Sequence, residues 1–152
     1  LWAHWPARLQ RLDHGPLLAP LPDAATAWLD GGHNAGAGEA ISAFFTGERL
    51  EGQKLQLVIG MLANKDVDAF LSPFAGRVAH IHALPVPGHE HHGAERFAAI
   101  AARWGIGCTA HDEPTAAIRA IAAAGHSAPK LLIGGSLYLA GEILRLNDQL
   151  PD

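Results

Sequence analysis

Apolar runs and amphipathic helical segments alternate along this chain, and the alternation constrains the fold more than any other feature. Leu55 to Met61 (LQLVIGM) is a continuous apolar run, as expected for a strand that is covered on both faces. Farther on, Phe97, Ile100 and Trp104 fall on one face of a helix. Such alternation is typical of a mostly parallel sheet with helices packed on both sides.

The same pattern predicts the remaining elements. We expect strands at 27–29, 55–61, 78–84, 106–109 and 131–133, further edge strands at 8–12 and 17–21, and helices within 40–45, 66–74, 97–104, 112–125 and 136–144. His80 and His82 indicate that the 78–84 strand has an exposed face or lies at the sheet edge. Pro16, Pro20 and Pro22 count against a strand at 17–21, because proline cannot donate to a ladder. The expected fold is α/β, with a mostly parallel sheet of about six strands.

Composition limits the classes of protein to which the chain can belong. Its 49% hydrophobic residues exclude wholesale disorder, and its net charge of −4 gives no support for general nucleic-acid binding. No apolar run approaches the roughly 18 residues of a membrane span. The single cysteine, Cys108, fits a reducing compartment, so we expect a cytoplasmic protein. Because residue 1 is Leu1 and not Met, we also expect a single domain, residues 1–152, cut from a longer protein.

Polar and glycine-rich clusters follow the expected strands. They are Asp30 to Asn34 (DGGHN), Asn64 to Asp66 (NKD), the histidines of 89–92 and Gly134 to Ser136 (GGS). In a parallel sheet such clusters meet at one edge, where open α/β sheets bind ligands. Each cluster also has a plainer interpretation: Asp30 and Asn34 are common turn and cap residues, Lys65 is a solvated lysine, and Ser136 is a helix cap.

The glycines of DGGHNAGAG suggest a phosphate-binding loop, but the known phosphate motifs do not fit. The dinucleotide pattern G-x-G-x-x-G fails because the glycines fall at 31, 32, 36 and 38. The P-loop pattern does not occur either; its nearest approach, GERLEGQK, has Gln53 at the lysine position and precedes a strand. The corner is therefore a ligand site of another kind, or only a turn.

Four segments of the chain resemble the C-terminal domain of folylpolyglutamate synthase and dihydrofolate synthase, in the Mur ligase superfamily. They are WPARLQRL, WLDGGHNA, LVIGMLANKDVDAFL and LLIGGSLYLAGEI, in family order from about Trp5 to Leu146. The resemblance implies a Rossmann-like three-layer sandwich of the Mur ligase C-terminal domain type. The family usually has Asp-Gly-Ala-His-Asn-Pro at the first corner, whereas Gly32 and Ala35 stand here in place of the alanine and the proline.

The resemblance also implies a reaction. The family joins glutamate to a carboxylate of folate or dihydropteroate, using ATP and Mg²⁺ through an acyl phosphate. Its N-terminal domain, which would be this chain's partner, holds the P-loop and the metal ligands. The resemblance therefore implies that the chain is inactive alone, supplies no metal ligand and binds ATP weakly by itself.

Individual positions take their expected roles from the family motifs. Arg8 and Asp30 would contact ATP. The guanidinium of Arg8 can present a planar fork of donors to phosphate, and the carboxylate of Asp30 is an acceptor suited to ribose hydroxyls. His33 would act at the reacting γ-phosphate or the incoming glutamate, as the catalytic residue. Lys65 would pair with a glutamate carboxylate, and Ser136 would help to hold the same amino acid at a helix start.

Three alternatives stay open on the sequence. His89, His91 and His92 have metal-ligand chemistry, but Gly93 stands where the zincin pattern H-E-x-x-H needs its second histidine. A stand-alone nucleotide-binding module and the C-terminal domain of a Mur-type cell-wall ligase are the others. No sequence pattern shows whether the substrate is dihydropteroate, folylpolyglutamate or both. None shows which residues bind the pterin or which oligomeric state the protein adopts.

Overall fold

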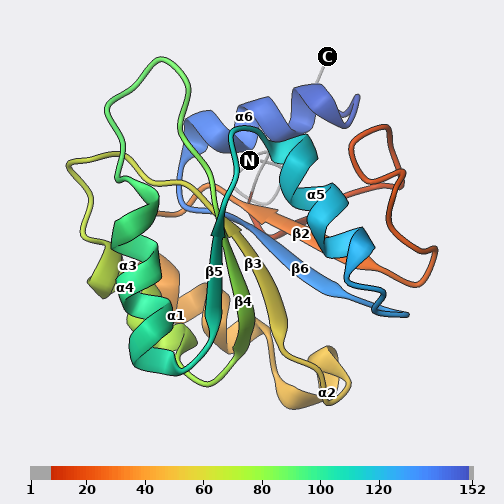
Figure 1. Ribbon diagram of the computed structural model, residues 1–152, viewed down its shortest axis with the longest axis horizontal. Helices are drawn as coiled ribbons and strands as arrows, with labels where there is room; N and C mark the ends of the chain where they lie inside the picture. Colours follow the sequence, from red (N-terminus) through yellow and green to blue (C-terminus); the bar gives the residue numbers. More distant parts are fainter. Residues whose placement is uncertain (1–7, 151–152) are drawn as a thin grey trace.

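The computed structural model describes residues 8–150, which form a six-stranded sheet between two layers of helices (Figure 1). The strands are β1 (Gln10–Arg11), β2 (Thr26–Asp30), β3 (Leu55–Ile59), β4 (Val78–Ala83), β5 (Gly107–Ala110) and β6 (Lys130–Gly134), in the order β1-β2-β6-β3-β4-β5. Only β1 is antiparallel to its neighbour. The expected α/β sheet of about six strands is confirmed. Trp5, where the family resemblance begins, lies outside the described residues.

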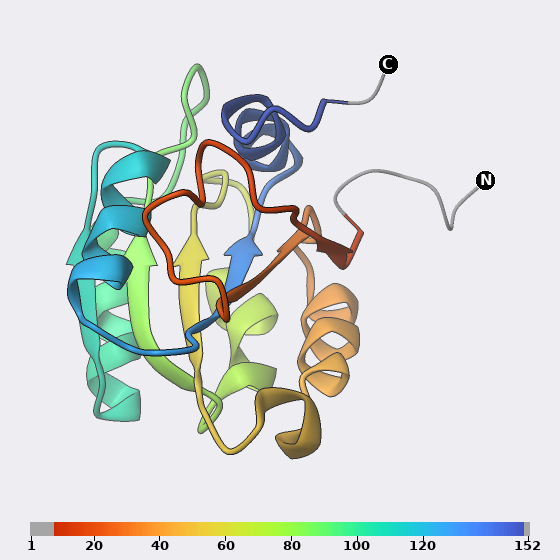
Figure 2. The same ribbon diagram turned by 90° about the vertical axis from the view of Figure 1, so that its right-hand side faces the viewer.

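The helices divide between the two faces of the sheet. One face carries α1 (Ala35–Phe44), α2 (Gly47–Leu50), α3 (Val67–Leu71), the 3₁₀ turn Ser72–Phe74 and α4 (Ala94–Trp104), and the other carries α5 (Pro114–Ala123) and α6 (Leu137–Leu146). Figure 2 shows the segment from 12 to 25 running across the second face, beside α5 and α6. The result is the three-layer sandwich predicted from the sequence.

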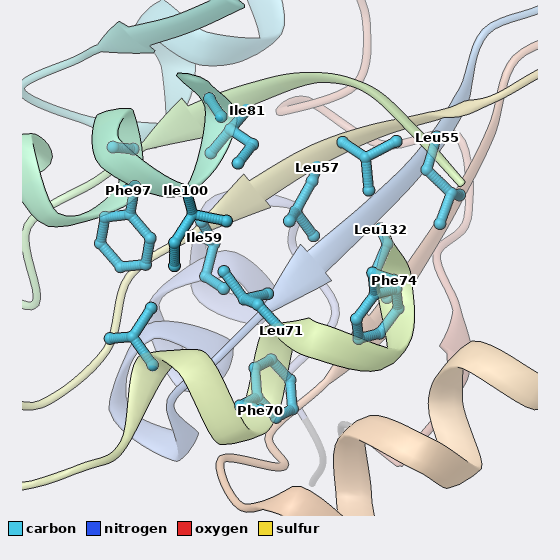
Figure 3. Packing of buried hydrophobic residues seen from close by; sticks show 14 of the residues in the cluster. Leu55, Leu57, Ile59, Phe70, Leu71, Phe74, Ile81, Phe97, Ile100 and Leu132 are labelled. Atoms are coloured by element: carbon cyan, nitrogen blue, oxygen red, sulfur yellow. The ribbon is translucent and has the colours of Figure 1, made fainter. Parts of the chain in front are cut away.

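Alternation along the strands builds a separate core on each face. On β6, Leu131 and Ile133 pack on the α5 and α6 side, while Leu132 packs on the side of α1, α3 and α4. Figure 3 shows the second core, in which Phe70 and Phe74 from the α3 region meet the strand side chains. The core on the α5 and α6 side is built from buried aliphatic side chains, and the other core adds buried phenylalanines, so the sheet is a rigid platform for the loops at its ends.

From β2 the chain adds strands in one direction across the sheet, through β3 and β4 to β5, and it then returns to place β6 between β2 and β3. Strands β2 and β3 are each followed by a helix on one face, α1 and α3, whereas β6 lies between them and is followed by α6 on the opposite face. The loops after these three strands therefore part around the carboxyl end of β6. Such a switch point is where open α/β sheets bind ligands.

Two local predictions are wrong. Residues 17–21 form turns and no strand: the N–H of Leu21 donates to the Leu18 carbonyl, and Leu17 and Leu18 bury their side chains beneath the segment. Strand β4 is internal, with β3 and β5 on its two sides, and His82 is buried. The first error arises because apolar residues of a loop can pack against distant parts of the chain without forming a strand. The second arises because a polar residue in a strand can be buried when distant side chains pair with it.

Candidate functional site

A pocket of about 280 Å³ lies at the carboxyl end of the sheet, where the loops after β2, β3 and β6 converge. In Figure 2 this is the end toward which the parallel strands point. The pocket is lined by His33, Leu62, Lys65, Gly135, Ser136, Leu137 and Tyr138. Three of the five predicted site residues, His33, Lys65 and Ser136, therefore share one cavity.

A larger cavity, of about 360 Å³, lies beneath the 12–25 segment. Its charged lining includes Arg11, Asp13 and the His14–Asp23 pair, whose atoms are 3.8 Å apart. None of the sequence-predicted site residues borders it. Position at the switch point and chemistry both favour the smaller pocket as the functional site.

The backbone of Lys65 is held by hydrogen bonds, whereas its side-chain ammonium has no partner within residues 8–150. Its N–H donates to the Leu62 carbonyl at 3.0 Å, and the next residue, Asp66, caps α3 through the Ala69 N–H. The side chain is half-buried and lines the pocket. Within residues 8–150, no hydrogen bond or ion pair to the ammonium is found. A partly desolvated, unpaired cation at a cavity wall attracts an anionic ligand.

Ser136 caps α6, as its plainer interpretation predicted. Its hydroxyl oxygen accepts hydrogen bonds from the backbone N–H groups of Tyr138 (3.1 Å) and Leu139 (3.4 Å). The side chain is buried, yet the residue borders the pocket, so its hydroxyl hydrogen remains available as a donor. The cap and the expected ligand contact are therefore compatible.

His33 lies in the corner after β2, and its ring has one unused nitrogen. Nδ1 is buried and is the one side-chain polar atom, among buried atoms of the described residues, that has no hydrogen-bond partner. Buried polar atoms are nearly always paired, and an exception often marks a functional group. The imidazole borders the same pocket as Lys65 and Ser136.

Asp30 does not line this pocket. One carboxylate oxygen, Oδ1, accepts the N–H of Gly32 at 2.7 Å, and Oδ2 accepts that of Leu9 at 2.9 Å. Asp30 is only 7% exposed, and its second bond holds Leu9 in a left-handed conformation (φ 43°). The exposed Arg8 precedes that residue. Neither Arg8 nor Asp30 lines the pocket that His33, Lys65 and Ser136 share.

The glycines of the corner allow close packing between segments. A Cβ on Gly31 would lie 2.4 Å from Cδ2 of Leu137, at the start of α6. Gly135 has φ +100°, and a Cβ there would lie 2.6 Å from the Gly60 carbonyl oxygen. The glycines thus bring the loops after β2, β3 and β6 together around the pocket, which accounts for a glycine-rich corner without a P-loop lysine.

A family comparison identifies the domain to which this architecture belongs. Residues 18–146 match the family described as "Dihydrofolate synthetase, C-terminal domain". The chain belongs to this family. The match separates it from the cell-wall Mur ligases considered on sequence, and it confirms the resemblance read from the four motifs.

Known relatives agree with this assignment. The folylpolyglutamate synthase of Lacticaseibacillus casei is 30% identical over 87 residues, which are 57% of this chain and 18% of that protein. The Mycobacterium tuberculosis folylpolyglutamate synthase complexed with ADP and AMPPCP has the same fold over 97% of this chain and 33% of its own, with a TM-score of 0.73 at 21% identity. The Yersinia pestis bifunctional folylpolyglutamate synthase/dihydrofolate synthase, complexed with AMPPNP and Mn ion, gives 0.71 at 20% identity, covering 94% of this chain and 31% of its own.

The chain therefore spans about a third of the length of these solved relatives. The part that matches is their C-terminal domain fold. No helix within residues 8–150 has the length and hydropathy that crossing a membrane requires.

The histidine-rich segment 89–92 is not arranged as a metal site in this dihydrofolate synthetase C-terminal domain. Among the described residues, no three His, Cys, Asp or Glu side chains are grouped to hold an ion. Instead, His92 Nε2 lies 2.7 Å from the Lys65 carbonyl oxygen, and the His89 ring stacks on Tyr138. No local sequence pattern marks the contact between His92 and Lys65, because it spans 27 residues.

A second histidine group lies on the α5 side of β4 and β5, away from the pocket. His82 Nδ1 is 3.0 Å from His111 Nε2, and its Nε2 is 3.1 Å from Gln56 Oε1. Burial, with His80 and His111 close by, lowers the pKa of His82 to about 3, so the ring is neutral at neutral pH. Burial also lowers the pKa of His80 and His111. This group is part of the packing of the sheet.

Proposed function

We propose that the chain is the C-terminal domain of an ATP-dependent ligase that joins glutamate to dihydropteroate or a folate through an acyl phosphate. One observation carries the proposal: an unpaired, half-buried lysine, Lys65, shares a pocket at the switch point with Ser136 and His33. Family membership supplies the reaction class. The relatives, named as folylpolyglutamate synthases, are consistent with this assignment.

The pocket chemistry suits the amino-acid substrate. Glutamate brings two carboxylates, and a lysine ammonium without an internal partner offers one of them a charge-assisted hydrogen bond. The hydroxyl of Ser136 can donate to the same ligand. The His33 imidazole lies at the wall of the pocket, where it can orient the glutamate amine or hold its proton during attack.

Nucleotide contacts are assigned to Arg8 and Asp30. Each carboxylate oxygen of Asp30 accepts one backbone N–H and has a second lone pair, which fits a ribose hydroxyl. Arg8, next to Leu9, can present its guanidinium to phosphate. We assign the P-loop and the Mg²⁺ ligands to a partner N-terminal domain, because the printed sequence has no P-loop pattern. Bound ATP and Mg²⁺ would supply carboxylate activation.

This division of labour makes a simple prediction for the isolated chain. It should show no ATP-dependent glutamate ligation and at most millimolar ATP affinity, because domain closure completes such sites. Calorimetric titration with ATP checks the second point. Submicromolar binding by the chain alone would favour the stand-alone nucleotide module.

The test of Lys65 is the same substitution at two lysines of the enzyme that contains this chain. Lys65→Met should raise the KM for glutamate roughly 10- to 100-fold, the size of a lost charge-assisted contact, with a much smaller change in the KM for ATP. Lys130→Met is the matched control, because Lys130 lies at the other end of β6 and pairs with Glu51 at 3.3 Å. It should leave the glutamate KM unchanged. Equal effects of the two substitutions would refute the assignment.

A further inference from the structure

The histidine-rich segment is joined to the Lys65 loop by a short ladder of hydrogen bonds. The Ala63 N–H donates to the Glu90 carbonyl, and the His92 N–H donates to the Met61 carbonyl, both at 3.0 Å. An antiparallel bridge between Leu62 and His91 lies between these bonds. The His92 ring then reaches the Lys65 carbonyl at 2.7 Å. The two loops thus form one unit.

The geometry fixes the chemistry of this last contact. A carbonyl oxygen only accepts, so His92 Nε2 must carry the proton. Both the neutral Nε2–H tautomer and the imidazolium donate from that atom, so the contact does not depend on the charge of the ring. With its N–H on Leu62 and its carbonyl on His92, the Lys65 backbone is held from both sides.

The surrounding helices hold the histidine segment in register. Asp68 of α3 is bonded to Arg96 and to Arg103 of α4, the latter at 2.6 Å, and these bonds keep the pKa of Asp68 below its usual value. Because these two bonds join α3 to α4, and α4 begins directly after the histidine segment, they also hold the end of that segment. On the other wall of the pocket, the His89 ring stacks on Tyr138 with centroids 3.8 Å apart. Figure 1 shows this loop beside the start of α6.

We propose that His92 is a positioning residue for Lys65. Its Nε2–H fixes the Lys65 carbonyl, so the ammonium is presented to the carboxylate of the incoming amino acid. The identity of that ligand rests on the proposed function, whereas the positioning of the loop does not. If the histidine segment were only a solvent-exposed loop, none of the effects described below would be expected.

Three substitutions separate the donor from the bulk of the ring. His92→Gln keeps an N–H donor the same number of bonds from the backbone as Nε2, whereas His92→Asn retracts it and His92→Phe removes it while keeping an aromatic ring. His91→Phe is the matched control. His91 is exposed, and its ring bonds only the His89 carbonyl within its own segment.

The first measurement needs no activity. In NMR spectra of the 152-residue chain, the Lys65 ¹³C′ and Asp66 amide resonances report the peptide group that His92 contacts. They should move in His92→Phe and His92→Asn, and should stay near their original positions in His92→Gln and His91→Phe. Unchanged resonances in His92→Phe, or equal shifts in all four variants, would overturn the proposal.

The second measurement is steady-state kinetics in the full-length enzyme. His92→Phe and His92→Asn should raise the glutamate KM by about 2- to 10-fold, the effect of one neutral hydrogen bond, and leave the ATP KM within twofold. His92→Gln should restore the glutamate KM to within twofold. Failure of Gln to rescue overturns the proposal. If Lys65→Met leaves the glutamate KM unchanged, the proposed function fails instead, and the NMR result still decides the role of His92.

Discussion

The two ends of the sheet use their polar side chains differently. At the amino end, one guanidinium nitrogen of Arg77 donates to the carbonyls of Ser42 (2.7 Å) and Phe45 (2.8 Å), and Lys130 pairs with Glu51. At the carboxyl end, Lys65 and one nitrogen of His33 have no such partner within residues 8–150. Arg77 and Lys130 have partners within the fold and so stabilise it, whereas the unpaired ammonium of Lys65 is available to a ligand.

Glycine substitutions should separate the two ends by the largest margin. Gly135 and Gly52 both have positive φ, +100° and +78°, but a Cβ on Gly135 would overlap the Gly60 carbonyl, whereas one on Gly52 would meet nothing within 4 Å. We expect Gly135→Ala to lower the free energy of unfolding by about 3–5 kcal/mol. Gly52→Ala should lower it by about 1–2 kcal/mol. Urea unfolding measures both, and equal losses would contradict the crowded packing at the carboxyl end.

Arg77 tests the structural role of the amino end. Arg77→Met leaves the Phe45 carbonyl without its donor, whereas the Ser42 carbonyl keeps the Phe45 N–H at 3.1 Å, so we expect a loss of about 1–3 kcal/mol in the free energy of unfolding. In the full-length enzyme, the glutamate KM should not change below the unfolding temperature. Chemical denaturation and kinetics on the same preparation check the pair of outcomes. A raised glutamate KM in a stably folded variant would remove the distinction between the ends.

The effect of the buried His82 should be visible as a pH dependence of stability. Its pKa in the folded chain, about 3, lies below the ordinary value of 6.5, so the unfolded chain binds more protons between these values. Stability should therefore fall as the pH drops through this window, by up to about 1.4 kcal/mol per pH unit from this group. His82→Gln should flatten the slope in urea unfolding between pH 6 and pH 4, roughly the middle of the window.

The exposed His126 supplies the control for this measurement. His126→Gln should leave the slope as it is, because the side chain is solvated in the folded chain. A residual slope is expected in His82→Gln, since burial also lowers the pKa of His80 and His111. A slope that is identical in His82→Gln and the unsubstituted chain would show that His82 does not set the pH dependence.

The sequence predicted those features that depend on local periodicity. Continuous apolar runs such as Leu55 to Met61 marked the buried strands, and the polar residues after them marked the carboxyl edge. Parallel strands bring such residues to one edge by geometry alone, which is why His33, Lys65 and Ser136 were found together. The roles of these residues remain predictions.

The features that sequence reasoning missed depend on contacts between distant segments. His92 reaches Lys65 across 27 residues, and His82 meets Gln56 and His111 across 26 and 29. No periodicity records such pairs. For the same reason the role of Asp30 in holding Leu9 was not foreseen, since the β1–β2 register brings that backbone to the carboxylate.

The central claim is that the Lys65 ammonium binds a carboxylate of glutamate, and a substrate–enzyme double cycle tests it most directly. In the full-length enzyme, kcat/KM is measured with glutamate, glutamine and the α-amide of glutamate, for unsubstituted and Lys65→Met protein. The account predicts that one of the two amides, the one lacking the paired carboxylate, is roughly 10- to 100-fold poorer with the unsubstituted enzyme. It also predicts that Lys65→Met loses this preference. If Lys65→Met lowers kcat/KM by the same factor for all three substrates, the ammonium does not bind either carboxylate and the claim is wrong.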